Sequence, residues 1–445
     1  MIEFAILDNG PTDLPIKRLP EGGLVPDGDL EAMHRSMQRT VVAQIRNAIF
    51  AEQAGFHYYF FTEHHFQPEG NEFSPNPLLL GAAIATRTRH LRLGQMANIV
   101  SWWHPIRLAE QAAMLDVISG GRLEFGVGRG LQPRETGIFA PYYGSSSTDE
   151  FRSLQYFEEA VEVILKAWTQ PSFSHHGEFF SFPPPYVAHH HQSTIDYFSQ
   201  PGVGRTPDQV LAIGEKTPNP VGIYSHLTTM KELQVFPRPL QSPHPQLWQP
   251  VVMSERSLRR AARLGMNAFI IGSSMEQIRN DVAAYMQAAD SLGWPDRLDR
   301  GAFNFGWDCR HKRGLGHVQQ VHLVGKGAGN PDKFRRGGKS VALYLSNYLP
   351  ANLGSQLFGQ LFSPQDSHEP SFIGSSQQVI DSFMQLKERG GYDDFLCAVG
   401  FRVPGMSGDE VHEQIQSFSE EVMPELVRAC GGAAPFKPAD PEMAI

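Results

Sequence analysis

Short apolar segments alternate with amphipathic helical segments along most of this chain of 445 residues. The first apolar run, Glu3–Asp8, is followed by a helical pattern over 30–54 that stops at Gly55. Eight expected strands are each followed by a helix or an irregular crossover, which predicts a parallel sheet closed into a (β/α)8 TIM barrel. The other expected strands are His57–Thr62, Leu91–Val100, Arg122–Val127, Gln246–Met253, Asn267–Ile271, Ala302–Trp307 and Asp394–Val399.

Two irregular stretches interrupt the alternation, one after the fourth expected strand and one after the seventh. The first, about 170–245, is rich in proline and histidine and is expected to be an insertion over one face of the barrel, with room for short strands. The second, about 310–375, combines glycines with basic residues and is expected to form a mobile lid. The sequence thus predicts a single barrel domain over 1–430 and a C-terminal tail at 431–445.

The composition excludes several classes of protein. A net charge of −9 offers no basic surface for nucleic acid, and no apolar run is long enough to indicate a membrane span. The start, Met1–Phe4, reads as a strand and not as a signal peptide. Three widely spaced cysteines fit a reduced, cytoplasmic protein. None of the 18 histidines stands in a metal-binding motif, so no metal is expected.

Polar side chains that could act on a ligand follow the second and third expected strands. His64 lies in the run Glu63–Phe66, and an imidazole can donate or accept a proton near neutral pH, although a rim histidine can equally be held by backbone groups. Ala97 and Asn98 close the third strand, where a small residue and an amide suit a planar, hydrogen-bonding ring or simply a turn.

Aromatic residues stand beside these positions. Phe66, Trp102 and Trp103 could line an apolar substrate pocket, or they could pack in the core or in loops.

The glycine-rich segment Ser119–Gly130, at the fourth expected strand, also carries residues that could contact a ligand. Glycines without a Cβ allow a close approach of the backbone to a ligand, and Arg129 suits a phosphate because its planar fork binds paired oxygens. Ser254 and Ser257 flank the start of the helix after the fifth strand, where serine is either a cap or part of an anion site. Taken alone, each segment fits an ordinary turn or cap equally well.

In combination and order, these segments resemble the bacterial luciferase-like family of flavin monooxygenases. The resemblance spans nearly the whole chain, with departures at the two irregular stretches. It is carried by Thr62–Phe66, Trp103–Glu110, Leu115–Gly130, Pro237–Pro245, Ser254, Ala261–Gly265, Ile373–Ser375 and Val422–Leu426.

The resemblance implies a TIM barrel that binds FMN and forms a homodimer through its early helices. It places Arg129 and Ser254 at the flavin phosphate, with Ser257 nearby, and it makes His64 the catalytic histidine. The residues that it places by the flavin ring or along the cofactor are Ala97, Asn98, Leu131 and Met253.

Two positions depart from the family pattern. Gly128 stands where luciferases have a reactive cysteine, and Gln132 stands where they have an aromatic residue. Both are expected to border the substrate pocket, and the loss of bulkier groups suggests room for a larger substrate than an aldehyde.

The resemblance therefore implies a two-component monooxygenase that receives reduced FMN from a separate flavin reductase. Molecular oxygen would form a flavin hydroperoxide, which would hydroxylate an organic substrate or insert oxygen in a Baeyer–Villiger reaction. His64 would manage the proton exchanged in that reaction. Two alternatives stay open, namely a deazaflavin-dependent hydride-transfer enzyme of the same superfamily and a non-catalytic flavin-binding protein. A metal hydrolase is disfavoured because the histidines at 189–191 are adjacent and not spaced for one ion.

Overall fold

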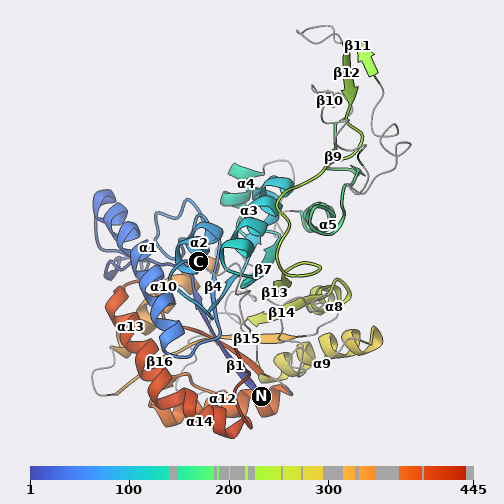
Figure 1. Ribbon diagram of the computed structural model, residues 1–445. Coiled ribbons are helices and arrows are strands. Elements are labelled where there is room, and N and C mark those ends of the chain that lie inside the picture. Colours follow the sequence, from blue (N-terminus) through green and yellow to red (C-terminus); the bar gives the residue numbers. More distant parts are fainter. Residues whose placement is uncertain are drawn as a thin grey trace.

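Eight parallel strands form a closed barrel, in which each strand pairs with two neighbours and β13 closes onto β7. In order around the barrel these strands are β13 (Gln246–Val251), β14 (Met266–Ile271), β15 (Leu315–Gln320), β18 (Phe395–Gly400), β1 (Ile2–Asp8), β4 (Tyr58–Phe61), β5 (Arg92–Gln95) and β7 (Leu123–Gly128). The computed structural model describes residues 1–140, 149–184, 188–189, 200, 216–218, 226–251, 254–271, 274–293, 314–325, 330–346, 370–392 and 395–436. The predicted TIM barrel is confirmed (Figure 1).

Helices surround this barrel and cover its outer face (Figure 1). They are α1 (Leu30–Gln53), α2 (Pro77–Ala85), α3 (Pro105–Ile118), α4 (Pro133–Phe139), α5 (Glu150–Thr169), α8 (Glu255–Arg263), α9 (Met275–Ser291), α10 (Pro331–Ser346), α12 (Ser376–Gly390), α13 (Gly408–Ser417) and α14 (Met423–Ala429). Side chains cap the first turn of most of them, as Asp29 does for α1 and Ser254 for α8. Among the described residues, no helix is long and apolar enough to cross a membrane.

Short strands add small sheets around the barrel. Within the predicted insertion at 170–245 they are β8 (His175–His176), β9 (Ser181–Phe182), β10 (Ala188–His189), β11 (Lys216–Pro218) and β12 (His226–Thr229), and β10 to β12 form a small sheet of their own (Figure 1). Elsewhere they are β2 (Ile16–Arg18), β3 (Leu24–Pro26), β6 (Asn98–Ile99), β16 (His322–Leu323) and β17 (Ile373–Gly374).

Two sequence predictions differ from the structure in the seventh barrel unit. The seventh barrel strand is β15, Leu315–Gln320, whose glycine, histidine and two glutamines hide its buried strand character, whereas the predicted strand Ala302–Trp307 lies outside the described residues. The stretch expected to be an irregular lid contains the regular helix α10. Its glycines serve packing, because a Cβ at Gly337 would lie 2.2 Å from the carbonyl oxygen of Pro404.

Three large aromatic rings fill the middle of the barrel, and we call them the aromatic plug. The ring centroids of Trp248 and Phe269 lie 4.6 Å apart, and Phe60 lies 4.9 Å from Phe269 and 5.6 Å from Trp248. The ring of Phe60 fits because the neighbouring strand carries Gly94, where a Cβ would lie 2.1 Å from Phe60 Cε1. Below the plug, the Trp248 indole donates to the buried Glu124 carboxylate at 2.5 Å, and Glu124 pairs with Arg92.

The residues above the plug follow from the two-residue period of a strand. Two positions after each plug residue come Thr62, Pro250 and Ile271, and all three line a cavity at the carboxyl end of the barrel. The larger apolar core lies between the barrel and its helices, where Phe125 meets Trp168 edge to face at 4.9 Å.

We expect Gly94→Ala to lower the free energy of unfolding by roughly 1–3 kcal/mol, because the added methyl group overlaps the Phe60 ring and forces the plug to shift. Urea denaturation measures this change. The loss should shrink in a Phe60→Leu background, where the ring is gone.

Gly137→Ala is the matched control, because a Cβ at this exposed position of α4 meets nothing within 4 Å. It should leave stability unchanged or raise it. If Gly94→Ala lowers the free energy of unfolding by the same amount in the wild-type and the Phe60→Leu backgrounds, the aromatic plug is not what opposes the added methyl group.

Candidate active site

A cavity of about 220 Å³ opens at the carboxyl ends of the barrel strands. Its floor is the apolar layer above the aromatic plug, and its walls come from the loops after the strands and from α10. The lining residues include Leu7, Asn9, Thr62, Glu63, His64, Glu72, Met96, Ala97, Trp102, Leu131, Gln132, Glu135, Gln320, Val341 and Leu345. Several of the polar groups come from the loops after β4 and β7, and others, such as Asn9, Gln320 and Arg402, come from other strand ends.

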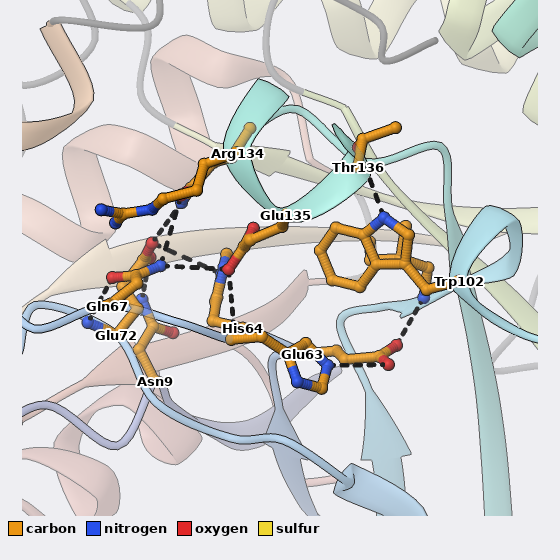
Figure 2. A network of polar contacts seen from close by, with 12 residues as sticks. Asn9, Glu63, His64, Gln67, Glu72, Trp102, Arg134, Glu135 and Thr136 are labelled. Carbon is orange, nitrogen blue, oxygen red and sulfur yellow. Dashed lines mark hydrogen bonds and ion pairs between the residues drawn. The ribbon is translucent and has the colours of Figure 1, made fainter. Parts of the chain in front are cut away.

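His64 stands between two buried carboxylates, as Figure 2 shows. Its Nε2 lies 3.4 Å from Glu72 Oε2, and its Nδ1 lies 3.5 Å from Glu135 Oε1. The imidazole comes from the loop after β4, Glu72 comes from further along that loop, and Glu135 comes from α4. Both ring nitrogens thus face an acceptor, which favours the doubly protonated, positively charged imidazole.

The charges of the three groups depend on one another. Burial lowers the pKa of His64, but Glu72 and Glu135 outweigh this effect and raise it to about 9. Burial raises the pKa of Glu72 and would do the same to Glu135, whose pKa nevertheless falls because His64 and backbone donors stabilise its ionised form. At neutral pH, His64 is therefore an imidazolium and holds a proton that it can give up.

Neutral amides brace the two carboxylates (Figure 2). Gln67 Nε2 donates to Glu135 Oε1 at 3.3 Å, and Gln67 Oε1 accepts from the Glu72 amide at 3.1 Å. Gln132 Nε2 donates to Glu72 Oε2 at 3.3 Å. The backbone amide of His65 donates to Glu135 Oε1 at 2.6 Å. Each carboxylate is thus fixed in place before any ligand binds.

A second polar group lies at the start of α8. The Ser254 hydroxyl accepts from the Ser257 amide at 3.2 Å and caps the helix, and Arg260 Nη2 lies 3.4 Å from Ser257 Oγ. Burial lowers the pKa of Arg260, and the nearby guanidinium of Arg129 lowers it further. Arg129 is affected in the same way by burial and by Arg256. These guanidinium groups form a cationic group near the Ser254 cap that an anion would stabilise, and Glu158, 3.9 Å from Arg260 Nε, offsets part of their charge.

The structure brings several of the predicted site residues to the cavity. His64, Ala97, Trp102, Leu131 and Gln132 line it. Arg129, Ser254 and Ser257 belong to the cationic group at α8, and Met253 lies outside the described residues.

The other predicted residues do not line the cavity. Asn98 is fully buried and donates to Gln95 Oε1 and to the Gly126 carbonyl. A Cβ at Gly128 would lie 3.0 Å from Ile99 Cδ1 and 3.3 Å from Ala97 Cβ, so neighbouring side chains already occupy the space expected there. Trp103 donates to Glu63 Oε1 at 2.8 Å, with the effect of fixing a rim loop.

Phe66 belongs to an aromatic cluster at the cavity mouth. It is 45% exposed, has a φ of 55°, and its ring lies 5.1 Å from that of Phe139. His65 lies 4.6 Å from Phe139 and 5.4 Å from Trp102, which itself lines the cavity. This cluster is placed to meet a ligand at the entrance and not inside the cavity.

Sequence reasoning missed Glu72, Glu135, Arg260 and Tyr344. Glu135 comes five residues after the glycine-rich segment, Glu72 comes six residues after Phe66, and Arg260 follows Ser257 by one helical turn, so each of these positions is near a motif. Tyr344 lies far from these motifs in the sequence and reaches the site only through the fold.

Comparison with known proteins places this site in context. The family described as luciferase-like monooxygenase matches residues 27–217. An uncharacterised protein of Sinorhizobium fredii is 38% identical over 145 residues, which cover 33% of this chain and 40% of that protein. The oxygenase component of the flavin-dependent trigonelline monooxygenase of Acinetobacter baylyi is 36% identical over 133 residues, covering 30% of this chain and 35% of that protein. The matches thus span about two fifths of the length of these relatives.

Solved structures share the barrel over nearly the whole chain. A monooxygenase from Streptomyces bottropensis has a TM-score of 0.63 at 22% identity, covering 95% of this chain and 99% of that one. The oxygenating constituent of 3,6-diketocamphane monooxygenase from Pseudomonas putida, in complex with FMN, has a TM-score of 0.61 at 17% identity, covering 95% and 98%. A deazaflavin-dependent secondary alcohol dehydrogenase has a TM-score of 0.56 at 13% identity, covering 95% and 98%. At these identities the likeness concerns the fold.

The charge of His64 gives a pH dependence to stability. Because its folded pKa of about 9 lies above the ordinary value of 6.5, the stabilising contribution is complete below about pH 6.5 and is lost as the pH rises through 9. The free energy of unfolding of wild type should exceed that of His64→Gln by on the order of 3 kcal/mol at most near pH 6.5. Denaturant unfolding at pH 6.5, 8 and 9.5 measures the difference. A gap that stays constant over this range would contradict the assigned charge.

Proposed function

We propose that this chain is an FMN-dependent monooxygenase of the luciferase-like family, whose model matches residues 27–217. Reduced FMN supplies two electrons when bound and lets molecular oxygen react, so that one oxygen atom enters an organic substrate and the other leaves as water. The observation that carries the proposal is a charged imidazole beside a cavity at the carboxyl end of the barrel, with a cationic group at α8.

The described residues fit a phosphorylated flavin. Arg129 and Arg260 would hold the phosphate together with Ser254, because the pKa of each arginine is lowered by burial and by neighbouring guanidinium groups that an anion would offset. Ala97 and Leu131 line the cavity and would border the flavin ring. Asn98 supports that wall from behind through its bond to the Gly126 carbonyl.

His64 would manage the proton of the reaction. As an imidazolium it can give a proton to an oxygen atom in the cavity, and the charges of Glu72 and Glu135 then favour the return of a proton from solvent to the imidazole. A general base with a pKa of about 9 would be protonated at neutral pH, so the geometry favours the role of an acid. The apolar floor and α10 keep water from this proton.

The relatives support a proposal for the partner and for the reaction type. We propose that a separate flavin reductase supplies reduced FMN, since the relative that acts on trigonelline is named as an oxygenase component. Baeyer–Villiger insertion is represented among enzymes of this fold by the diketocamphane enzyme, and hydroxylation is the other outcome that we propose for this chain. The aromatic cluster at the mouth, with Phe66 and Phe139, suits a planar or alicyclic substrate. A homodimer and a single domain over 1–430 stay predictions of the resemblance.

A deazaflavin-dependent hydride transfer is the second candidate, because an enzyme of that kind shares the barrel. The two cofactors both carry phosphate, so the group at α8 does not separate them. Quenching of tryptophan fluorescence by reduced FMN or by a reduced deazaflavin, each at micromolar concentration, decides between them.

FMN should bind more weakly to Arg260→Ala by roughly 10–100-fold, because a charge-assisted hydrogen bond to an anion contributes about 1.5–3 kcal/mol. Riboflavin, which lacks the phosphate, should bind equally to both proteins. Fluorescence titration with each flavin measures the two affinities.

Arg259→Ala is the matched control, since Arg259 lies next to Arg260 on α8 but pairs with Glu255 at 2.7 Å. It should leave FMN affinity unchanged. Equal losses for FMN and riboflavin in Arg260→Ala would show that the phosphate lies elsewhere.

Substrate-dependent oxygen consumption tests the proposed reaction directly. With a flavin reductase and NADH present, candidate ketones, N-heterocyclic acids and aldehydes are screened for oxygen uptake without an equal yield of hydrogen peroxide. His64→Gln should lower the coupled rate by about 100-fold or more, with the lost turnover appearing as hydrogen peroxide. Oxygen uptake that always equals the hydrogen peroxide yield in wild type, for every compound tried, would favour a flavin-binding protein without oxygenase activity.

A further inference from the structure

Helix α10 forms one wall of the cavity and carries a tyrosine whose hydroxyl reaches the polar side. Val341 and Leu345 line the cavity, and Tyr344 between them is buried. The Tyr344 hydroxyl donates to Gln132 Oε1 at 2.6 Å and accepts from Arg134 Nη2 at 2.9 Å. The guanidinium therefore strengthens the phenol as a donor to the amide.

Gln132 connects Tyr344 to the carboxylate of Glu72, which faces His64. Its Nε2 donates to Glu72 Oε2 at 3.3 Å, and the same oxygen lies 3.4 Å from His64 Nε2. A side-chain amide has one accepting end and one donating end. Because Tyr344 donates to the oxygen, the NH₂ end of Gln132 is left to face Glu72. A flipped amide would set its oxygen against the Glu72 carboxylate, so that two acceptors would face each other there.

The carboxylates around His64 come from the loop after β4 and from α4, and not from α10. Glu135 from α4 faces the imidazole at 3.5 Å, and Glu63 precedes it in the chain and adds a further attraction. His65 faces Glu63 at 3.4 Å. Arg134 is paired with Glu69 at 2.9 Å, so its charge is largely balanced within the loop. Tyr344 is thus the group of the described α10 through which the helix reaches the imidazole.

We propose that Tyr344 is a positioning residue, which orients Gln132 so that the Glu72 carboxylate is held against His64, and which thereby couples the seating of α10 to the charge of the imidazole. The link to turnover rests on the proposed function, whereas the link to the charge of His64 does not. When α10 is packed as in this structure, the cavity wall is complete and His64 keeps its proton. When α10 moves, Gln132 Oε1 keeps the longer contact with Gln67 Nε2 at 3.4 Å, and the contact of Gln132 with Glu72 weakens, while Asn9 Nδ2 still donates to Glu72 Oε1 at 3.1 Å.

A second anchor of the same helix provides the matched control. The Ser340 hydroxyl donates to Asn71 Oδ1 at 3.1 Å, one turn before Tyr344, and this contact does not continue to His64 in the described residues. Ser340→Ala removes an anchor of α10 without changing the hydrogen bonds of the Gln132 amide. A comparison of Tyr344→Phe with Ser340→Ala therefore separates the effect of the contacts from Tyr344 through Gln132 to Glu72 from the effect of anchoring the helix.

The experiment is an NMR titration of the imidazole protons of the flavin-free protein. The His64 signal is identified as the one missing from His64→Gln among the 18 histidines. Tyr344→Phe should move the midpoint of His64 to lower pH by about 0.5–1 pH unit, because the Glu72 carboxylate loses its brace. Ser340→Ala should leave the midpoint in place. Gln132→Met should reproduce the shift of Tyr344→Phe, and the double variant should add nothing further.

An unchanged midpoint in Tyr344→Phe, or an equal shift in Ser340→Ala, would overturn the proposal. Should Tyr344→Phe fail to fold, Gln132→Met tests the same link. The pH profile of coupled turnover should shift in the same direction as the midpoint. A shifted midpoint in a protein that oxygenates no substrate would leave the link from Tyr344 to His64 intact and reject only the proposed function.

Discussion

The aromatic plug of Phe60, Trp248 and Phe269 decides where this barrel can bind a ligand. Because these rings fill the middle of the barrel, the only space left within the described strands lies above them, at the carboxyl ends. The two-residue period of each strand then selects which side chains reach that space. Thr62, Pro250 and Ile271 follow the plug residues by two positions and form the cavity floor. The placement of the site thus follows from packing, before any polar residue is considered.

The polar side of the cavity depends on charge balance. Two buried carboxylates facing one imidazole would be unstable if the imidazole were neutral, since buried charges need partners. His64 resolves this by remaining protonated, and Glu135 stays ionised for the same reason. At α8 the balance is reversed, because Arg129 repels Arg260, and Glu158 at 3.9 Å offsets only part of this cationic charge. One end of the site thus holds a proton, while the other end is suited to an anion.

Much of this arrangement could be predicted from the sequence, and the rest could not for physical reasons. Strands such as Tyr58–Phe61 are rich in aromatic residues and were recognisable, whereas Leu315–Gln320 contains a glycine and two glutamines and was not. His64 lies in a recognisable motif, but its charge depends on Glu72 and Glu135, which only the fold brings near. The glycines around Gly325 and the basic residues that follow them predict a mobile lid, whereas the described part of this stretch contains the regular helix α10, whose Gly337 allows a close approach to Pro404.

The two positions that depart from the luciferase pattern, Gly128 and Gln132, do not affect the site equally. At Gly128 the missing side chain leaves no free space, because Ile99 and Ala97 occupy it. At Gln132 an amide lines the cavity and also bonds to Tyr344 and Glu72. An aromatic ring at this position could fill the cavity but could not connect the two groups by hydrogen bonds. The feature that distinguishes this site is therefore the polar link between the wall formed by α10 and the charged histidine, and a substrate that moves that wall also acts on the proton.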